Sequence, residues 1–368
     1  MKLLRSCFRI LIGLVFIFSG FVKGVDPLGT AFRIEDYFVA FSIPWAGRFA
    51  IELAILLIVL EFTIGVSLLF NLWIRKTAWL LLLVMTYFTV LTFIDAIWNL
   101  VPDCGCFGDA IKLTNIQTFI KNLVLMGFVI PVFMWRKKYR SALPVRADIS
   151  LLLITALVFS WMSVYSARHL PLKDFMAWKK GNRVNKTENR PVKFFVTYKN
   201  KKTGEKKEYL ASNYPWNDTL WMSQWVFDSQ RVEDPNAGRA ASLMVEDMNG
   251  NDMTASVLQN PDYQFILVAY NLGKTNKTSF VKILPFYKKA LASGMTFICI
   301  TSAMPDEVRK FKLQQGAAFD FYNADDVILK TMVRSNPGLI LLKDGLVVDK
   351  WAFRDFPDWD VVNETYFK

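Results

Sequence analysis

The chain has 368 residues, of which 53% are hydrophobic, and its net charge is +12. That length is sufficient for about two or three domains. Much of the positive charge flanks apolar segments or lies in lysine-rich loops, and no nucleic-acid-binding signature accompanies it, so we expect no nucleic-acid partner. The four cysteines are too few for a disulfide scaffold.

Apolar runs in the first half of the chain predict an α-helical membrane domain. Five of them reach the roughly 20 residues that a helix needs to cross a bilayer. They lie near residues 6–24, 49–71, 77–99, 116–135 and 149–166. A signal peptide is an alternative interpretation of the first run, because it has a basic start and small residues at Ser19-Gly20. Its cleavage would leave the topology downstream unchanged.

Basic residues predict how these helices are oriented, because Lys and Arg collect in cytoplasmic loops. Three clusters fall on one side if the N-terminus is cytoplasmic: Lys2, Arg5 and Arg9; Arg75 and Lys76; and Arg136, Lys137, Lys138, Arg140 and Arg146. The loops 25–48 and 100–115 are poorer in Lys and Arg. We therefore expect a multi-pass protein of the bacterial inner membrane, with a cytoplasmic N-terminus and a periplasmic C-terminal part.

The segment 31–41 has the pattern of a short amphipathic helix lying at the outer face of the membrane. Charged residues separate its apolar side chains, which are Phe32, Ile34, Tyr37, Phe38 and Phe41. An ordinary polar loop is the alternative.

Ionisable residues within the apolar runs are candidates for function, because charge inside a bilayer is costly. Glu61 lies near the middle of the second run, whereas Glu52 and Asp95 lie nearer the outer face, where water can reach them. Lys23 ends the first run on that side, and we expect it to pair with Asp95 or Glu52. Lys121 lies early in the fourth run. Alternatively, these residues are interhelical pairs or snorkelling ends that hold the bundle together.

Two cysteines one residue apart lie in the stretch 103–109, which reads DCGCFGD. A disulfide needs Cα atoms about 4.4–6.8 Å apart, whereas two residues of extended chain span about 7 Å. Cys104 and Cys106 can therefore be bridged only if the backbone bends, which Gly105 permits. Strained, exposed disulfides are labile and oxidising, which suits redox chemistry. A structural disulfide and incidental thiols in a turn are the alternatives.

The surroundings of this pair bear on its chemistry. The N-terminus of the fourth helix should lower a cysteine pKa, and Asp103 and Asp109 should oppose that effect. Two cysteines and two aspartates without histidine make a poor zinc site, and the chain has no CxxCH motif for haem. We therefore expect no metal. The remaining cysteines, Cys7 and Cys299, lie far away in the sequence.

The membrane half resembles a known family. The segment GLVFIFSGFVKG at 13–24, the following DPLGT, the glutamate-bearing second run and the CGCFGD loop are similar to DoxX/MauE-type four-helix membrane proteins, over about residues 1–140. The resemblance implies thiol redox chemistry at the membrane, associated with quinones, and for MauE-like members disulfide formation during maturation of methylamine dehydrogenase. It implies Cys104 and Cys106 as the redox pair and a membrane quinone as a cofactor. A fifth run and about 200 further residues are departures from the small members.

Residues 167–190 read as a linker that carries His169, the single histidine of the chain. Residues 192–210 predict a β-hairpin, because FFVTY and EYL flank a polar turn at Thr203-Gly204. The stretch 211–235 has no clear period and contains Trp216, Trp221 and Trp225. Core packing is the favoured role of these aromatic residues, and contact with a partner or the membrane is the alternative.

From about residue 240 the pattern predicts an α/β domain. A hairpin with a turn at Asn249-Gly250 comes first. It is followed by the buried strand FILVAY, a helix over 280–291, the strand MTFICIT, a helix over 305–315 and a closing hairpin of LILL and LVVDKW. The expected division is a four-helix domain at 1–140, a fifth helix at 147–168, a linker and hairpin region at 169–239 and the α/β domain at 240–368.

The order of these elements over 240–352, with Pro285 inside the first helix and Pro337 before the closing hairpin, resembles the thioredoxin fold of TlpA-like proteins. That fold usually has a cis-proline where Pro337 lies. Lys277 and Phe280 stand in the places of the two cysteines of its CxxC motif, so the domain cannot itself exchange a dithiol. Cys299 belongs to an apolar strand and is expected in the core. We expect the domain to bind client proteins.

These patterns favour a membrane thiol–disulfide oxidoreductase that uses Cys104 and Cys106, exchanging electrons with a quinone or another membrane partner. Glu61, Asp95 and Lys23 would assist proton movement or electrostatics. Two other functions stay open. One is a non-enzymatic scaffold that recruits an envelope partner, and the other is a small-solute or lipid transporter that uses Glu61. The transporter ranks last because the chain has no evident inverted repeat.

Overall fold

A computed structural model describes residues 1–101, 104–141, 143–184, 193–201, 203–211, 213, 215, 218–233 and 243–368. Among them are five helices long and apolar enough to cross a membrane. They are α1 (Lys2–Val25), α3 (Ala50–Phe70), α4 (Ile74–Trp98), α5 (Asn115–Met134) and α6 (Val145–Arg168). These helices coincide with the five apolar runs, and the prediction of a multi-pass membrane protein is confirmed.

Helix α1 packs closely against α3 because glycines remove side chains from their contact. A Cβ atom at Gly65 would lie 2.6 Å from the backbone nitrogen of Ile17, and one at Gly20 would lie 2.9 Å from Phe62. Gly13 faces Leu69 and Gly65 at similarly short distances. Gly13 and Gly20 of the segment 13–24 therefore let α1 pack closely against α3.

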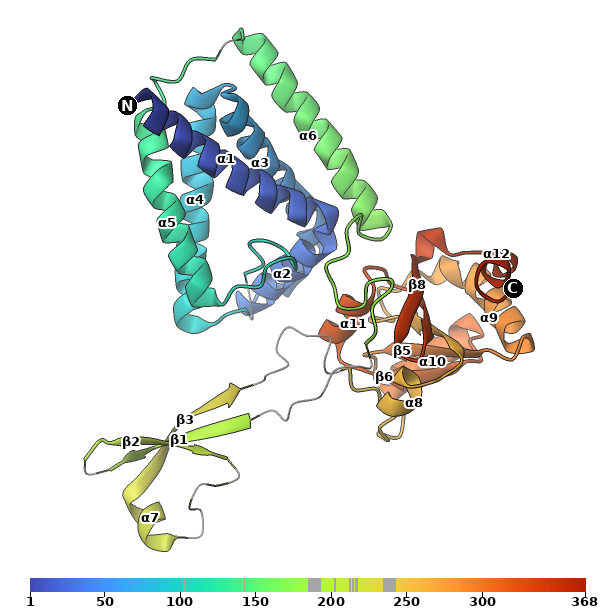
Figure 1. The fold of residues 1–368 in the computed structure, drawn as a ribbon. Helices are drawn as coiled ribbons and strands as arrows, with labels where there is room; N and C mark the ends of the chain where they lie inside the picture. The colour runs from blue at the N-terminus through green and yellow to red at the C-terminus, as the bar shows by residue number, and fades with distance from the viewer. Residues whose placement is uncertain are drawn as a thin grey trace.

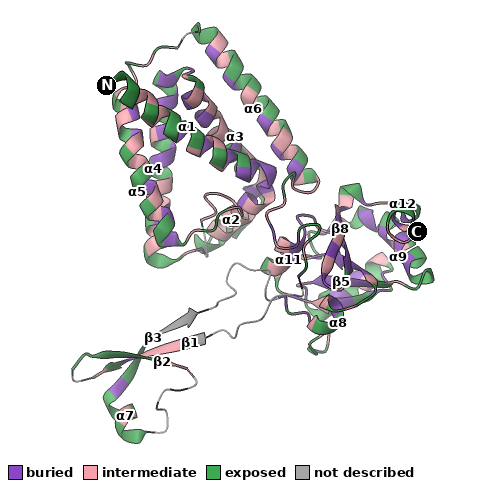
Figure 2. Ribbon diagram, viewed as in Figure 1, coloured by how far each residue is buried: buried purple, intermediate pink, exposed green. Residues whose placement is uncertain are grey.

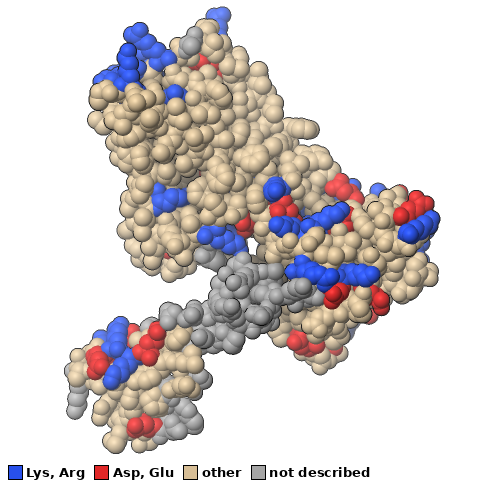
Figure 3. All heavy atoms as spheres, viewed as in Figure 1, with Lys and Arg blue, Asp and Glu red and all other residues tan. Residues whose placement is uncertain are grey.

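The predicted amphipathic segment is helix α2 (Pro27–Ala40), which lies at the end of the bundle away from the N-terminus. It begins four residues earlier than the sequence pattern indicated, because the Asp26 side chain accepts a hydrogen bond from the Gly29 nitrogen and Pro27 starts the helix. A 3₁₀ turn, η1 (Pro44–Phe49), leads from it into α3. Figure 3 shows Lys and Arg gathered at the opposite end of the bundle, around the N-terminus.

The hairpin predicted over 192–210 is present as β1 (Lys193–Asn200) and β2 (Lys206–Leu210). A strand that the sequence did not indicate, β3 (Trp225–Glu233), pairs antiparallel with the other edge of β1, after the short helix α7 (Thr219–Gln224). Trp225 is buried and stacks on Trp221 with ring centroids 5.7 Å apart, which supports core packing. Trp216 lies outside the described residues.

The C-terminal α/β domain has a five-stranded sheet in the order β6-β5-β4-β7-β8. The strands are β4 (Tyr263–Val268), β5 (Thr296–Thr301), β6 (Asp320–Asn323), β7 (Gly338–Lys343) and β8 (Leu346–Ala352). Strands β4, β5 and β6 run parallel, and β7 and β8 are antiparallel. The helices are α8 (Thr254–Leu258), α9 (Phe280–Ala292), α10 (Pro305–Gln315), α11 (Asp326–Met332) and α12 (Trp359–Tyr366), with a 3₁₀ turn, η3 (Phe353–Asp355), after β8.

Alternate residues of these strands point to opposite faces of the sheet. Phe265 and Leu267 belong to one apolar core, and Ile266 and Val268 belong to the other. Figure 2 shows the buried residues concentrated along the sheet. The Asn336–Pro337 peptide bond is cis, as the resemblance to the thioredoxin fold implied. The protein is thus a membrane helix bundle followed by a thioredoxin-like domain.

The hairpin expected at Asn249-Gly250 is reduced to a single antiparallel bridge, between Glu246 and Asp252.

Candidate functional site

The cysteine loop joins α4 to α5 at the end of the bundle that carries α2. Gly105 and Gly108 have φ angles of 62° and 54°, and the Gly108 nitrogen donates to the Gly105 carbonyl oxygen at 2.9 Å. Few residues other than glycine adopt such angles without strain. The resulting turn brings the sulfurs of Cys104 and Cys106, both free thiols, to 3.6 Å from each other.

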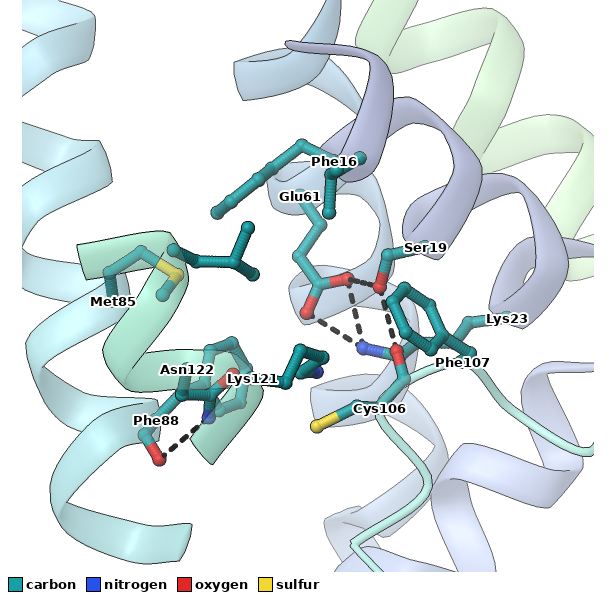
Figure 4. Close-up of a pocket in the computed structure, with 12 residues that line it drawn as sticks. Phe16, Ser19, Lys23, Glu61, Met85, Phe88, Cys106, Phe107, Lys121 and Asn122 are labelled. Carbon is teal, nitrogen blue, oxygen red and sulfur yellow. Dashed lines mark hydrogen bonds and ion pairs between the residues drawn. The ribbon is translucent and has the colours of Figure 1, made fainter. Parts of the chain in front are cut away.

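Helix α1 holds the loop against the bundle. The hydroxyl of Ser19 lies 2.8 Å from the carbonyl oxygen of Cys106 and 3.0 Å from Oε2 of Glu61, so it can donate to either. The ring of Phe107 packs against the ring of Phe18, with the ring centroids 5.6 Å apart. Figure 4 shows Ser19, Glu61 and Phe107 around Cys106, whose sulfur points into a small cavity of about 30 Å³. A cavity of that size can hold a water molecule.

Lys23 forms a buried ion pair with Glu61, not with Asp95 or Glu52 as we expected from the sequence. Its Nζ lies 2.8 and 2.9 Å from the two carboxylate oxygens. The close contact of α1 with α3 places Lys23 opposite the middle of α3. Glu52 lies near the start of α3 and is exposed. Removing one partner of such a pair typically costs about 3–5 kcal/mol, because the other charge stays buried.

Asp95 is fully buried and accepts a hydrogen bond from the hydroxyl of Tyr37 in α2. Its Oδ1 atom has no hydrogen-bond partner among the described residues. The Tyr37 hydroxyl also contacts the sulfur of Cys104. Tyr37 therefore connects the thiol pair to a buried carboxylate. From the sequence it was one apolar residue of an amphipathic helix, and nothing in the pattern distinguished it from its neighbours.

The two thiols are in different electrostatic surroundings. The pKa of Cys106 is lowered to about 6, first by the hydrogen bond with Cys104 and then by the positive charges of Lys121 and Lys23, while burial opposes this. The same hydrogen bond and burial raise the pKa of Cys104. Lys121 also lies over the Phe107 ring, 4.6 Å from its centroid. The positive charge that lowers the pKa of Cys106 thus comes from lysine side chains. From the sequence we expected it to come from the N-terminus of the fourth helix.

Asp109 attaches the loop to the thioredoxin-like domain. Its Oδ2 accepts from Nη2 of Arg334 at 2.6 Å, and Oδ2 of Asp26 accepts from Nε of the same arginine at 3.0 Å. All three side chains are buried. Burial raises the pKa of Asp26, and Arg334 opposes this. Gly29 leaves room for the contact, since a Cβ there would lie 2.9 Å from Asp109. Asp103, the other candidate carboxylate of the loop, lies outside the described residues.

Further contacts join the same surfaces. Lys274 lies 3.4 Å from Glu35 of α2, and Tyr270 packs against Phe32 with ring centroids 6.1 Å apart. Tyr270 and Lys274 precede the helix start where a thioredoxin has its cysteines, and Arg334 precedes cis-Pro337. The edge of the domain that would face a substrate in a redox-active thioredoxin therefore contacts α2 and the cysteine loop.

The thioredoxin-like domain has no thiol at this edge. Lys277 lies in the 3₁₀ turn η2 (Lys277–Ser279) and Phe280 is the first residue of α9. Cys299 is fully buried in β5, as expected, and burial raises its pKa. Cys7 lies on α1, more than two helical turns before Ser19. His169 stacks on Tyr165 and contacts Asp355 at 2.6 Å.

A second cavity, of about 370 Å³, reaches the thiol pair from the side of α2, α3 and α4. Cys104, Gly105 and Cys106 form part of its wall. In the described part of the chain, no group of three or more His, Cys, Asp or Glu side chains could hold a metal ion. The site thus consists of a dithiol, two lysines, a tyrosine and buried carboxylates beside an apolar cavity.

Fold and site together define a multi-pass membrane protein whose thiol-bearing loop contacts a thioredoxin-like domain. The family described as "Methylamine utilisation protein MauE" matches residues 1–135, so the membrane half is MauE-like, as the sequence motifs indicated. "Protein TlpB" of Flavobacterium psychrophilum is 31% identical over 137 residues, which are 34% of this chain and 35% of that protein. The match thus spans about a third of that relative's length. No solved structure is significantly similar to the chain.

Proposed function

We propose that this protein is a membrane thiol–disulfide oxidoreductase in which Cys104 and Cys106 alternate between dithiol and disulfide. The observation that carries the proposal is the pair of free sulfurs, 3.6 Å apart on a turn beside a buried ion pair. A disulfide needs sulfurs about 2.0 Å apart, so a small movement of the loop suffices to form it. The MauE-like membrane half supports the same chemistry.

The difference in pKa between the two thiols suggests which sulfur of the disulfide a client attacks. A thiol with a lower pKa leaves faster, and Cys106 is the thiol with the lowered pKa. A thiolate of a client protein would therefore attack Cys104, form a mixed disulfide and release Cys106 as a thiolate beside Lys121. The second client thiolate would then attack the client sulfur, which forms the client disulfide and releases Cys104. The two protons that the client thiols lost on ionisation protonate the released thiolates, so the pair ends as a dithiol that has gained two electrons and two protons.

The buried groups around the pair have distinct roles in this proposal. Tyr37 contacts both Cys104 and Asp95, so a proton can pass between the Cys104 sulfur and the carboxylate through the tyrosine hydroxyl. Lys23 and Glu61 neutralise each other, and Ser19 beside them can hold the backbone of Cys106 by donating to its carbonyl oxygen. Asp109 acts at a distance from the sulfurs, by binding Arg334.

We also propose a location for this chemistry. The basic clusters lie at the end of the bundle opposite to the cysteine loop, which supports a cytoplasmic N-terminus and a periplasmic loop and C-terminal domain in a bacterial inner membrane. The proposed domains are the four-helix unit at 1–140, the fifth helix at 147–168, the linker and hairpin region at 169–239 and the thioredoxin-like domain at 240–368.

The thioredoxin-like domain is proposed to bind client proteins of the envelope close to the loop. Its fold and its contact with the loop through Arg334 support this role. Because its cis-proline edge contacts α2, a client that bound there would replace those contacts. A scaffold without redox chemistry is the alternative, and it is favoured by a partner that co-purifies equally well after both loop cysteines are replaced.

Trapping free thiols by alkylation in cells tests the proposal. In the wild type we expect a mixture of alkylated and disulfide-bonded Cys104 and Cys106, which shifts to the disulfide when an oxidant is added. Cys106→Ser should instead leave Cys104 alkylated or captured in a mixed disulfide with a client, because Cys104 is the sulfur that the client attacks. Cys7→Ser, at an exposed position on α1, is the matched control without effect. The proposal is wrong if the pair stays reduced under all conditions, or if the double serine variant retains full function.

A further inference from the structure

The cis-proline edge of the thioredoxin-like domain surrounds one aromatic side chain of α2. The cationic ends of Lys330 and Arg334 lie over the ring of Phe32, 5.0 and 5.3 Å from its centroid. The ring of Tyr270 meets the same ring edge-on, with the centroids 6.1 Å apart. A cation over the face of an aromatic ring is attracted by the quadrupole of that ring. The domain thus holds Phe32 by three side chains, as a binding site holds a ligand.

Carboxylates beside this ring complete the contact. Oε1 of Glu35 lies 3.4 Å from Nζ of Lys274. Asp26 and Asp109 accept hydrogen bonds from Arg334 at 3.0 and 2.6 Å. The side chain of Arg334 is only 5% exposed. A segment that covered this arginine without supplying a carboxylate would leave a buried charge unpaired, which is costly. Such a cost selects against uncharged segments.

We propose that this edge selects client segments in which an aromatic residue lies close to two or more carboxylates, and that α2 occupies the edge as an intramolecular competitor. The proposal rests on the client-binding role argued above and states which clients the domain accepts. The aromatic ring of the client would take the place of Phe32. Its carboxylates would pair with Arg334 and Lys274, as those of the membrane half do.

A peptide with the sequence of residues 26–36, DPLGTAFRIED, is the probe for this chemistry. It carries a fluorophore and is added to the full-length protein in nanodiscs. One control peptide, with Asp26→Asn, Glu35→Gln and Asp36→Asn, lacks the carboxylates. A second, with Phe32→Leu, keeps an apolar side chain without a ring. We expect Kd to rise by at least about tenfold for the first control and by about two- to fivefold for the second.

Amide hydrogen exchange shows whether the peptide binds at the cis-proline edge. The parent peptide should make exchange in α2 faster, because α2 loses its contacts when the peptide takes its place. The carboxylate-free peptide, at the same concentration, should leave exchange in α2 unchanged.

Two variants of the full-length protein remove the Glu35–Lys274 ion pair from opposite sides. Glu35→Gln weakens only the competitor, so we expect the parent peptide to bind about two- to fivefold more tightly. Lys274→Gln should leave its Kd unchanged, because the peptide and α2 then lose the same partner. If the pair merely held the two halves together, both variants would release α2 equally and change Kd equally. Glu307→Gln and Lys310→Gln, at exposed positions on α10, are the matched controls without effect.

The outcomes separate this selectivity from the functions on which it rests. Equal Kd values for the parent and carboxylate-free peptides would overturn the selectivity, and so would equal effects of Glu35→Gln and Lys274→Gln. If the parent peptide does not bind, or binds without faster exchange in α2, client binding at this edge is contradicted as well. Thiol trapping, which uses no peptide, tests the redox function separately. A thiol pair that stays reduced would contradict that function, while the selectivity would still follow from the peptide data.

Discussion

At the scale of single residues, the chemistry of the site depends on how one thiol differs from its neighbour. Cys104 and Cys106 are separated by one glycine, yet only Cys106 has its pKa lowered. Once Cys106 is ionised, the Cys104 thiol can donate to it, and Lys121 and Lys23 add positive charge nearby. Tyr37 contacts the other sulfur. The surroundings of the two thiols thus shift their pKa values in opposite directions.

The reaction of Cys106 with iodoacetamide should report this difference. Because its pKa is lowered to about 6, the thiolate is present above that pH and is lost as the pH falls through it. An ordinary thiol titrates near about 8.5. We expect the alkylation rate of Cys106 in the reduced protein, measured by peptide mass spectrometry, to be half-maximal near pH 6. Lys121→Met should shift the profile upward, whereas Lys112→Met, on the exposed part of the same loop, should not. A wild-type profile centred near the ordinary value would contradict the interpretation.

At the scale of secondary-structure elements, the close contact of α1 with α3 determines the site. Ser19 and Lys23 are on α1 and Glu61 is on α3, so their meeting depends on how near the two helices come. Gly65 allows the backbones to approach, since a Cβ atom there would collide with Ile17. In a bilayer, such small residues are what makes close helix packing possible.

Gly65→Ala should therefore destabilise the bundle by about 1–3 kcal/mol, because the added methyl group overpacks the contact. Gly127→Ala on α5 is the matched control, since a Cβ atom at that position meets nothing within 4 Å. It should be neutral or stabilise the helix by about 0.5–1 kcal/mol, because alanine loses less entropy than glycine on folding. The measurement is thermal unfolding of both variants in the same detergent. Equal Tm values for the two variants would show that the contact is not tight.

At the scale of the whole molecule, one arginine of the thioredoxin-like domain joins the two halves. Arg334 binds Asp26 at the start of α2 and Asp109 of the cysteine loop, and all three side chains are removed from water. A buried ion-pair network of this kind is by itself weak evidence that the fold is stabilised. Removing one of its charged side chains is nevertheless costly, because the others stay buried. The domain is thereby held against the start of α2 and the cysteine loop, with its cis-proline edge facing the membrane half.

Arg334→Gln should loosen this contact, because it leaves two buried carboxylates without their cation, at a cost of about 3–5 kcal/mol. We expect faster maleimide labelling of Cys104 and Cys106 and faster hydrogen exchange in α2, with the fold of the domain retained. Arg309→Gln, at an exposed position on α10, is the matched control. Labelling that is unchanged in Arg334→Gln would mean that the domain does not restrict access to the thiols.

Much of the fold was predictable because its signals are local. Long apolar runs identified five membrane helices, and hydrophobic periodicity identified β4, β5, α9, α10 and the closing hairpin to within a few residues. The elements that were missed are short or lie at edges. Strand β6 has four residues, and α11 and α12 have seven and eight, so few apolar positions distinguish them from loops.

The candidate redox residues could be identified without the structure, since DCGCFGD has the one close pair of thiols and the thioredoxin-like domain has none at its cis-proline edge. Their partners could be identified only from the packing of the helices and domains. Lys23 pairs with Glu61 because glycines bring α1 and α3 together, and Tyr37 reaches Cys104 because α2 folds back over the loop. Arg334 meets Asp109 across 225 residues of chain. Hydrophobic spacing reports the face of a helix, whereas the partner of a charge depends on which faces the packed helices present to each other.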